Sequence, residues 1–262
     1  MPPEAESLLE RARSASGDEL QALVHDSSGE ALLAVLENPH CEELHVTLLL
    51  ERLELPANVI DAVAAHPKWM SSEGVRLRLA AHPRTSKRIA LATLRQLYLF
   101  DLVRLSFLPS APANIRRAAE EILLARVPSL PVGQKLTLAR RGPSRVAAAI
   151  LAEGHAQVIK PALNNPFLTE SQILKVLAKA GVLERVVAAI AQHSKWAGQY
   201  HVRRALLRNS HTPVPCVLAF LPQFKLHDVR EIARLQDLAP RLRKYVEQEL
   251  ARRSQSEPPG EP

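Results

Sequence analysis

One short motif with the residue types of a reactive site occurs twice in the sequence. His-x-Lys-Trp stands at 66–69 and again at 193–196. A histidine there could act as a general base, a lysine could hold a phosphate, and a tryptophan could stack on a nucleobase. The structural interpretation is favoured, because a duplicated unit seldom keeps one catalytic site twice. Residues that both copies share are more simply explained as residues that the fold of each copy requires.

The structural interpretation assigns a role to each residue of the motif. We expect His66 and His193 to satisfy the last carbonyls of a preceding helix. We expect Trp69 and Trp196 to fill a gap between helices, with the indole N–H bonded to backbone. The motif is therefore an element of the fold and not a catalytic centre.

Arginines recur at matched positions after the motif. Arg76 and Arg203 follow the two tryptophans by seven residues. They could bind a partner's carboxylate or phosphate, but a cation–π contact with the neighbouring indole is favoured. Arg116 and Arg243 each stand four residues before a glutamate, which predicts an intrahelical ion pair of about 0.2–0.5 kcal/mol. The duplicated positions to which we assign a structural role are His66, Trp69, Arg76, His193, Trp196 and Arg203.

Signatures of known catalytic, metal and cofactor sites are missing from the sequence. It has no His-Glu dipeptide, no phosphate-binding glycine loop and no Gly-x-Ser-x-Gly, which argues against zincin hydrolases, nucleotide-binding loops and serine hydrolases of the α/β type. Its two cysteines, Cys41 and Cys216, are too few for a disulfide scaffold or a cysteine-based zinc site. We therefore expect no enzyme, and we assign no catalytic residue, metal ligand or cofactor.

Basic residues that have no acidic neighbour at helical spacing are better candidates for partner binding. The first 60 residues carry 12 acidic and 3 basic residues, whereas residues 61–262 carry 15 acidic and 31 basic ones. If successive repeats align their basic runs, the runs form a stripe for an acidic partner; the alternative is an ordinary solvated surface. The candidates are Arg84, Lys87, Arg88, Arg140, Arg141, Arg145, Arg203, Arg204 and Arg208.

The duplicated motif belongs to a much longer repeat. His66 and His193 are 127 residues apart. Without any gap, the same shift aligns positions along most of the chain, among them Asn38-Pro39 with Asn165-Pro166, Val75-Arg76 with Val202-Arg203, and Thr85 with Thr212. Residues 11–123 and 138–250 are therefore two copies of one unit.

A finer period runs inside each copy. Asn38-Pro39 and His82-Pro83 are turns 44 residues apart, and Asn165 and Asn209 repeat that step. Units of about 40–47 residues are typical of HEAT and armadillo repeats, and 127 residues hold about three of them. Short apolar stripes at helical spacing, punctuated by 20 prolines, predict helices throughout.

Local signals place several helix starts. Thr169 with Gln172 predicts a capping box, and Thr212 predicts a cap before Pro213 at the start of the next helix. We expect an all-α solenoid of about six HEAT/armadillo-like repeats, built by tandem duplication of a 127-residue unit. Its expected parts are an acidic N-terminal segment or cap helix at 1–15, three-repeat units at 16–137 and 138–253, and a disordered tail at 254–262.

The turns at Asn38-Pro39, Asn165-Pro166 and His66-Pro67-Lys68-Trp69 resemble those of bacterial helical-repeat proteins of the HEAT-like, leucine-rich-repeat-variant type. The segments His82-Pro83-Arg84-Thr85 and 115–120 share this resemblance. The resemblance covers about residues 16–253. It implies an α-solenoid that binds other macromolecules and brings no catalytic residues.

Three functions follow as hypotheses. The first is a non-enzymatic scaffold or adaptor that binds a protein partner on an extended curved surface. The alternative is sequence-nonspecific binding of nucleic acid through phosphate contacts on the basic stripe, and the third is a helical-repeat enzyme like the DNA glycosylases. Apolar runs too short for a bilayer predict no membrane span, and an acidic first segment predicts a cytoplasmic protein. The charge asymmetry also allows head-to-tail contact between copies.

Overall fold

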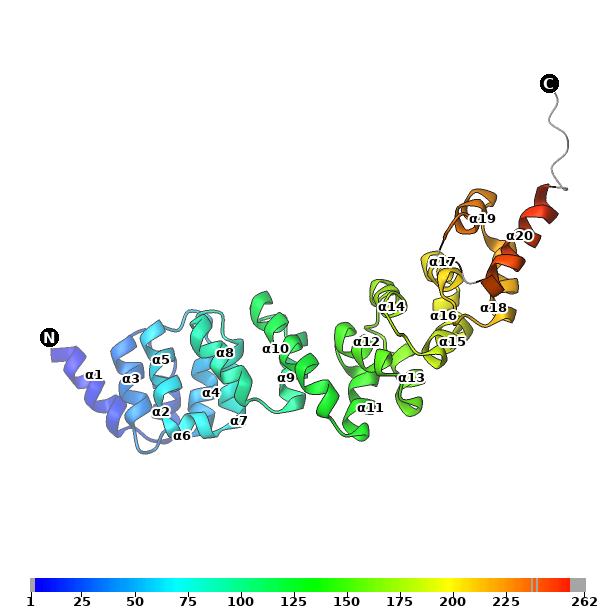
Figure 1. The fold of residues 1–262 in the computed structure, drawn as a ribbon. Helices are drawn as coiled ribbons and strands as arrows, with labels where there is room; N and C mark the ends of the chain where they lie inside the picture. Colours follow the sequence, from blue (N-terminus) through cyan, green and yellow to red (C-terminus); the bar gives the residue numbers. More distant parts are fainter. Residues whose placement is uncertain (1–2, 237, 239, 255–262) are drawn as a thin grey trace, which may run out of the picture. The chain divides into compact units, whose positions relative to one another are not determined.

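The computed structural model describes residues 3–236, 238 and 240–254, and the chain divides into two compact units, Met1–Ala125 and Arg126–Pro262. Within the described residues every regular element is helical: 20 α-helices and two short 3-10 helices, with no strand (Figure 1). This confirms the expected all-α class. The domain limits expected from the sequence stay predictions, and all of the expected tail except Ser254 lies outside the described residues.

Unit 1 consists of ten α-helices. They are α1 (Pro3–Ser14), α2 (Gly17–Leu23), α3 (Gly29–Glu37), α4 (Glu43–Glu51), α5 (Ala57–Ala65), α6 (Pro67–Ser71), α7 (Glu73–Ala81), α8 (Lys87–Gln96), α9 (Leu99–Phe107) and α10 (Ala113–Arg126).

Unit 2 continues with a 3-10 turn and ten more helices in its described part. They are η1 (Val127–Ser129), α11 (Val132–Arg141), α12 (Ser144–Glu153), α13 (Ala156–Leu163), α14 (Glu170–Leu177), α15 (Glu184–Gln192), α16 (Ser194–Ala197), α17 (Tyr200–Arg208), α18 (Val214–Phe220), η2 (Leu221–Gln223), α19 (Leu226–Ala233) and α20 (Pro240–Ser254).

The two sets of helices correspond one for one when the chain is shifted by 127 residues. α5 and α7 map onto α15 and α17 with identical bounds, and α8 maps onto α18 together with η2. The remaining seven pairs agree to within a few residues at each end, which is the ordinary variation in helix limits. The described helices of unit 1 therefore match those of unit 2 in order and approximate length, and their residues can be compared at the 127-residue shift.

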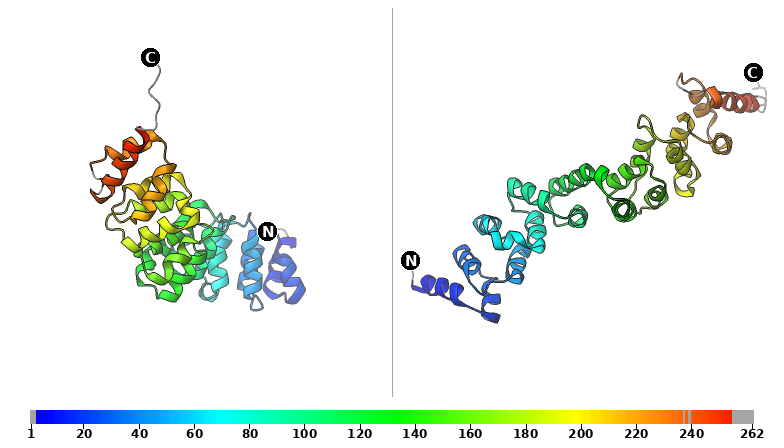
Figure 2. Two further views of the ribbon diagram at one scale, coloured as in Figure 1. Left: turned by 90° about the vertical axis from the view of Figure 1, so that its right-hand side faces the viewer. Right: turned by 60° about the horizontal axis from the view of Figure 1, so that its bottom comes forward.

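Within each unit the helices pack as two rows. In unit 1, α3 packs against both α1 and α5, while α4 packs against α7; the helices of this unit are those coloured from blue to green in Figure 2. In unit 2, α13 lies between α11 and α15, while α14 lies between α12 and α17. Aliphatic side chains such as Leu32, Leu49 and Ile60 are fully buried between the rows of unit 1. No helix in the described part of the chain is long and apolar enough to cross a bilayer.

A buried asparagine links helices that are not consecutive in the chain. Asn38 ends α3, and its Nδ2 donates to the carbonyls of Ala12 and Ala15, each at 2.9 Å. Its Oδ1 accepts from the backbone N–H of His40 at 2.7 Å. The last carbonyls of a helix have no partner within that helix, so the Asn38 side chain closes the end of α1.

Asn165 repeats this arrangement in unit 2. Its Nδ2 donates to the carbonyls of Ala139 (2.9 Å) and Gly142 (3.0 Å), and its Oδ1 accepts from the N–H of Phe167 at 2.7 Å. All of these partners are the residues that the 127-residue shift predicts. At the Asn-Pro turns, the repeat in the sequence thus corresponds to a repeated set of hydrogen bonds.

In the second turn of each copy, a side chain again contacts a backbone carbonyl near the end of an earlier helix, but the residue types differ. His82 Nε2 lies 2.9 Å from the carbonyl of Arg52, and its Nδ1 accepts from the N–H of Arg84. At the equivalent position, Asn209 Nδ2 reaches the carbonyl of Leu177 at 3.5 Å. The 44-residue step seen in the sequence therefore corresponds to a recurring turn structure.

Two of the predicted helix caps are wrong. Thr169 precedes α14, but its hydroxyl lies against the hydroxyls of Ser144 and Ser171 and caps no backbone N–H. Thr212 donates to the carbonyl of Leu206 at 2.6 Å, so it closes α17 instead of opening α18. The hydroxyl group of a threonine that follows a helix can donate to the free carbonyls of that helix as readily as it can accept from the free N–H groups of the next helix.

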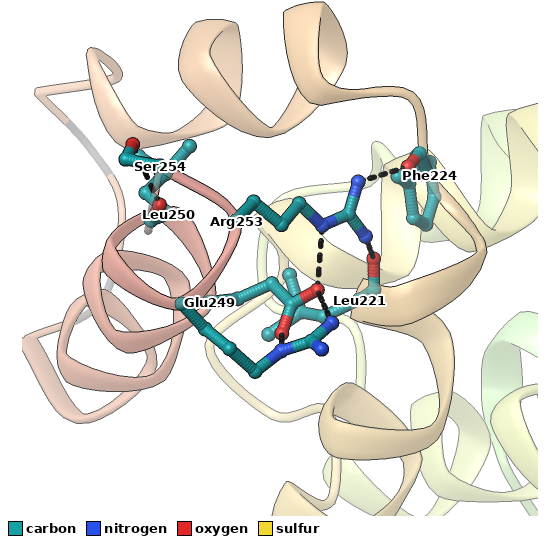
Figure 3. Close-up of polar contacts among 7 residues, drawn as sticks. Leu221, Phe224, Glu249, Leu250, Arg253 and Ser254 are labelled. Atoms are coloured by element: carbon teal, nitrogen blue, oxygen red, sulfur yellow. Dashed lines mark hydrogen bonds and ion pairs between the residues drawn. The ribbon is translucent and has the colours of Figure 1, made fainter. Parts of the chain in front are cut away.

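The last helix of unit 2 is held by an arginine–glutamate cluster (Figure 3). Arg253 donates to the backbone carbonyls of Leu221 (2.8 Å) and Phe224 (2.6 Å), and to Glu249 Oε1 at 2.6 Å. Arg252 also pairs with Glu249, at 2.8 and 2.9 Å. These two guanidinium groups lower the pKa of Glu249 to about 2, and the cluster ties α20 to η2.

Candidate binding grooves

The tryptophan of each His-x-Lys-Trp motif is part of the core. Trp69 and Trp196 are each 2% exposed, and the ammonium groups of Lys68 and Lys195 lie 4.3 and 4.2 Å from the centres of the two indole rings. Each lysine is therefore engaged in a cation–π contact with its own tryptophan.

The two indoles differ in one hydrogen bond. Trp196 Nε1 donates to the carbonyl of Leu163 at 2.9 Å, as expected. Trp69 Nε1 is buried without an acceptor among the described residues, so the expected bond is absent from this copy. The two tryptophans are buried at equivalent positions, but only the indole N–H of Trp196 has a hydrogen-bond acceptor among the described residues.

The histidines close helices through their backbone. The N–H of His66 donates to Val63 O, and that of His193 donates to Ile190 O. The ring of His193 contacts Asn164 Oδ1 at 3.2 Å, and burial together with the charge of Lys195 lowers the pKa of His193. The helix-ending role is as predicted, but it belongs to the main chain and not to the imidazole.

The expected stacking of Arg76 and Arg203 on the indoles is wrong. Arg76 Nη1 donates to the carbonyls of Met70 and Ser71, which end α6. Arg203 reaches the Gln223 side chain, and its guanidinium lies 5.9 Å from the centre of the Phe224 ring. The guanidinium groups instead contact the carbonyls at the end of a short helix in unit 1 and a neighbouring phenyl ring in unit 2.

One predicted ion pair is replaced by backbone contacts. Arg243 donates to the carbonyls of Ala233 and Leu235 and not to Glu247. On α10 an i,i+4 pair is formed by the neighbouring Arg117 and Glu121, at 3.4 Å. At Arg243 the carbonyls at and just after the end of α19 thus compete successfully with a carboxylate for the guanidinium group.

The nine basic candidates fall into several local settings. Arg84, Lys87 and Arg88 lie in unit 1, at or just before the start of α8. The others belong to unit 2: Arg140 and Arg141 end α11, Arg145 lies on α12, and Arg203, Arg204 and Arg208 lie on α17. Arg204 and Arg208 line one hollow, whereas Arg140 lines another with Lys160 and Asn164. A single stripe joining all nine stays a prediction.

Unit 1 has a groove between α4 and α7. Its volume is about 320 Å³. Leu77 and Ala81 of α7 form part of its wall and are only 8% and 7% exposed. At its rim Leu53 is 62% exposed, and Arg78 pairs with Glu51 at 3.5 Å. The groove is largely apolar, with its charges paired.

Unit 2 has the corresponding groove between α14 and α17, with a volume of about 660 Å³. Leu174, Leu177, Ala178 and Ala205 supply its apolar surface, and His201, Arg204, Arg208 and Asn209 supply its polar surface. Arg204 is engaged by Glu231 at 2.5 Å. Arg208 is exposed and has no carboxylate partner among the described residues.

The 127-residue shift relates the two grooves directly. Leu50 of the first corresponds to Leu177 of the second, and both line their groove. In contrast, Leu77 corresponds to Arg204 and Ala81 to Arg208. The difference is reversed at Arg78, which corresponds to Ala205. The copies therefore keep the hollow and differ in the placement of its charges: Arg78 is paired with Glu51, whereas Arg208 has no carboxylate partner among the described residues.

A second, smaller hollow adjoins Arg208. Its volume is about 230 Å³, and Lys179, Arg208, Asn209 and His211 contribute to its lining. Lys179 is exposed and has no carboxylate partner in the part of the chain that the structure describes. The positive surface thus continues past the end of α17 to the turn after α14.

The sequence prediction included Arg204 and Arg208 but missed the groove and its other lining residues. A signal was present in the self-alignment: positions 77 and 81 are apolar in one copy and basic in the other, while core positions such as Val75 and Val202 match. Charge differences on one face of a duplicated helix mark a surface that has diverged.

The remaining reactive groups are buried or isolated. Burial raises the pKa of the Cys41 thiol to about 11 and also raises that of Cys216, so both thiols stay protonated near neutral pH. No cluster of histidine, cysteine and acidic side chains that could hold a metal ion occurs among the described residues.

The fold and its grooves define an all-α protein made of two equivalent helical units. Comparison of the chain with protein-family models, curated proteins and solved structures gives no match.

Proposed function

We propose that this protein is a non-enzymatic scaffold that binds a protein partner through the grooves between its paired helices. The observation that carries the proposal is the recurrence of one groove, α4–α7 and α14–α17, at equivalent positions of both units. In the scaffold that we propose, the helix pairs form about six HEAT/armadillo-like repeats of an α-solenoid.

The composition of the grooves supports a protein partner. The unit 1 groove has mostly apolar walls with charged groups at its rim, and the unit 2 groove combines apolar side chains with polar and charged ones. Grooves between helices of this kind receive an amphipathic segment, whose apolar face enters and whose polar face stays in water. Leu53, at the rim of the unit 1 groove, is the exposed apolar contact most accessible to such a segment.

The test compares two leucines of unit 1 that are similarly exposed. Leu53→Asp places a charge at the groove rim, whereas Leu44→Asp does so on α4 at a residue that does not line the groove; these leucines are 62% and 57% exposed. We expect the full chain to capture a protein whose recovery falls at least tenfold with Leu53→Asp and is unchanged with Leu44→Asp. Equal recovery with both variants would refute the role of the groove.

Nucleic-acid binding is the second candidate, favoured by the charge of unit 2. Residues 126–262 contain 21 basic and 10 acidic residues, whereas residues 1–125 contain 13 and 17. Binding through phosphates weakens steeply with added salt, because counterions are released. A mobility shift of a 20-nucleotide single strand that is complete at 50 mM salt and lost at 300 mM would favour this function over the scaffold.

A further inference from the structure

The two grooves have the same position and different chemistry. In unit 1 the side of α7 that lines the groove carries Leu77 and Ala81, four residues apart on one helix face. In unit 2 the same face of α17 carries Arg204 and Arg208. The core-facing residues Val202, Leu206 and Leu207 remain apolar and buried, so the arginines replace none of these core residues.

The positive charge of the unit 2 groove is only partly neutralised from within. Arg204 is held by Glu231 of α19, and that pair leaves little charge. Arg208 and Lys179 have no carboxylate partner among the described residues, and His201 and His211 lie beside them. Arg208 lines both hollows, so a ligand in either one meets its guanidinium group.

We propose that the groove between α14 and α17 binds an acidic segment of a protein partner, with Arg208 as the charged anchor. The inference rests on the proposed function and specifies the partner's chemistry for this groove. Apolar side chains of the segment pack against Leu174, Leu177 and Ala205, and its aspartates or glutamates pair with Arg208 and Lys179. Arginine suits this role because its planar guanidinium group forms paired hydrogen bonds with a carboxylate.

The lining of the groove favours a peptide over a nucleic acid. A phosphodiester backbone has no apolar groups to cover the leucines and alanines of the groove. Single-stranded nucleic acid is held by bases stacked on aromatic rings, and His201 is the one ring-bearing side chain of this groove among the described residues. An acidic peptide with apolar residues matches both kinds of surface.

Substitution by the equivalent residue of unit 1 provides the test. Arg208→Ala introduces the residue that stands at position 81, and alanine favours a helix, so α17 is kept. Arg208→Lys keeps the charge and loses the paired geometry. Arg117→Ala, on α10 of unit 1, removes an exposed arginine that lies outside the groove and is not one of the nine candidates, and it serves as the matched control.

The full chain and the three variants are each used to select binders from a displayed library of random 12-residue peptides. We expect the wild type and Arg117→Ala to enrich peptides with acidic residues beside apolar ones, and Arg208→Ala to lose the acidic preference. In fluorescence anisotropy, a selected acidic peptide is expected to bind Arg208→Ala about tenfold more weakly and Arg208→Lys about threefold more weakly.

The possible failures are distinct. Peptides enriched without an acidic preference, or the same acidic peptides selected by Arg208→Ala, would overturn this inference and leave the scaffold function standing. Absence of any enriched peptide would overturn both. A 20-nucleotide single strand that binds more tightly than the peptides and depends on Arg208 would assign the groove to nucleic acid. Dimers in light scattering that Arg208→Ala dissolves would assign it to a second copy of this chain.

Discussion

Asparagines 38 and 165 allow the contribution of one repeated link to be measured twice in the same chain. Each side chain makes three hydrogen bonds, two from Nδ2 to carbonyls and one from a backbone N–H to Oδ1. Both residues are buried, at 3% and 0% exposure. A net contribution of about 1 kcal/mol for each bond predicts that Asn38→Ala or Asn165→Ala lowers the free energy of unfolding by about 3 kcal/mol.

Asn209 is the internal comparison for this prediction. Its Nδ2 reaches a single carbonyl at 3.5 Å, and its Oδ1 accepts one N–H at 2.9 Å. Asn209→Ala should therefore cost about 1 kcal/mol. Asn38→Asp keeps the acceptor oxygen but aims a carboxylate at two carbonyl oxygens, so it should cost at least as much as Asn38→Ala.

Urea unfolding followed by circular dichroism at 222 nm measures these changes, and hydrogen exchange locates them. Exchange should accelerate in α1 and α3 for Asn38→Ala, and in α11 and α13 for Asn165→Ala. The two alanine variants should agree within about 0.5 kcal/mol because their partners are equivalent. A stable Asn38→Asp variant, or a cost for Asn209→Ala equal to that of Asn165→Ala, would refute the reasoning.

Three further predictions concern unequal or charged contacts. Trp196→Phe should lower the free energy of unfolding by about 1 kcal/mol more than Trp69→Phe, because only Trp196 donates a hydrogen bond; parallel urea titrations check this, and equal costs would contradict it. The lowered pKa of Glu249 contributes stability that is present above pH 4.5 and lost as the pH falls toward 2. Glu249→Gln should therefore cost about 1–2 kcal/mol at pH 7 and almost nothing at pH 2, allowing for the exposure of Arg252, and a loss independent of pH would be inconsistent with this cause. A hydrogen bond to the neighbouring acidic side chain of α9 raises the pKa of Glu73, so the folded state favours the protonated form and loses stability as the pH rises. Glu73→Gln should raise the thermal midpoint at pH 7 and leave it unchanged at pH 3; a lower midpoint at pH 7 would oppose it.

The helical class and the register of the duplication could be predicted from the sequence because they depend on periodic apolar residues and punctuating prolines. The partners of individual polar side chains could not. Arg76 and Thr212 each come shortly after the end of a helix. The sequence does not show whether their side chains bond to the free carbonyls of that preceding helix or to groups of the segment that follows. In the structure both side chains donate to a carbonyl six residues back.

The candidate site shows the same limit. Arg204 and Arg208 were identified as basic residues without an acidic neighbour at helical spacing, yet Arg204 is engaged by Glu231 from another helix. Such a pair connects residues 27 positions apart, which no local pattern encodes. The groove itself depends on how α14 and α17 pack, so it became visible only when the helices were placed side by side.

The asparagine links also set a length requirement on the chain. In both copies the side chain reaches back 26 residues to one carbonyl and 23 residues to the other. The intervening segments contain α2 in one copy and α12 in the other. An extra residue in a helix turns everything after it by about 100° and would move the amide away from both acceptors. We therefore expect insertions and deletions to be excluded from residues 16–37 and 143–164, and natural length variation to collect elsewhere in the chain.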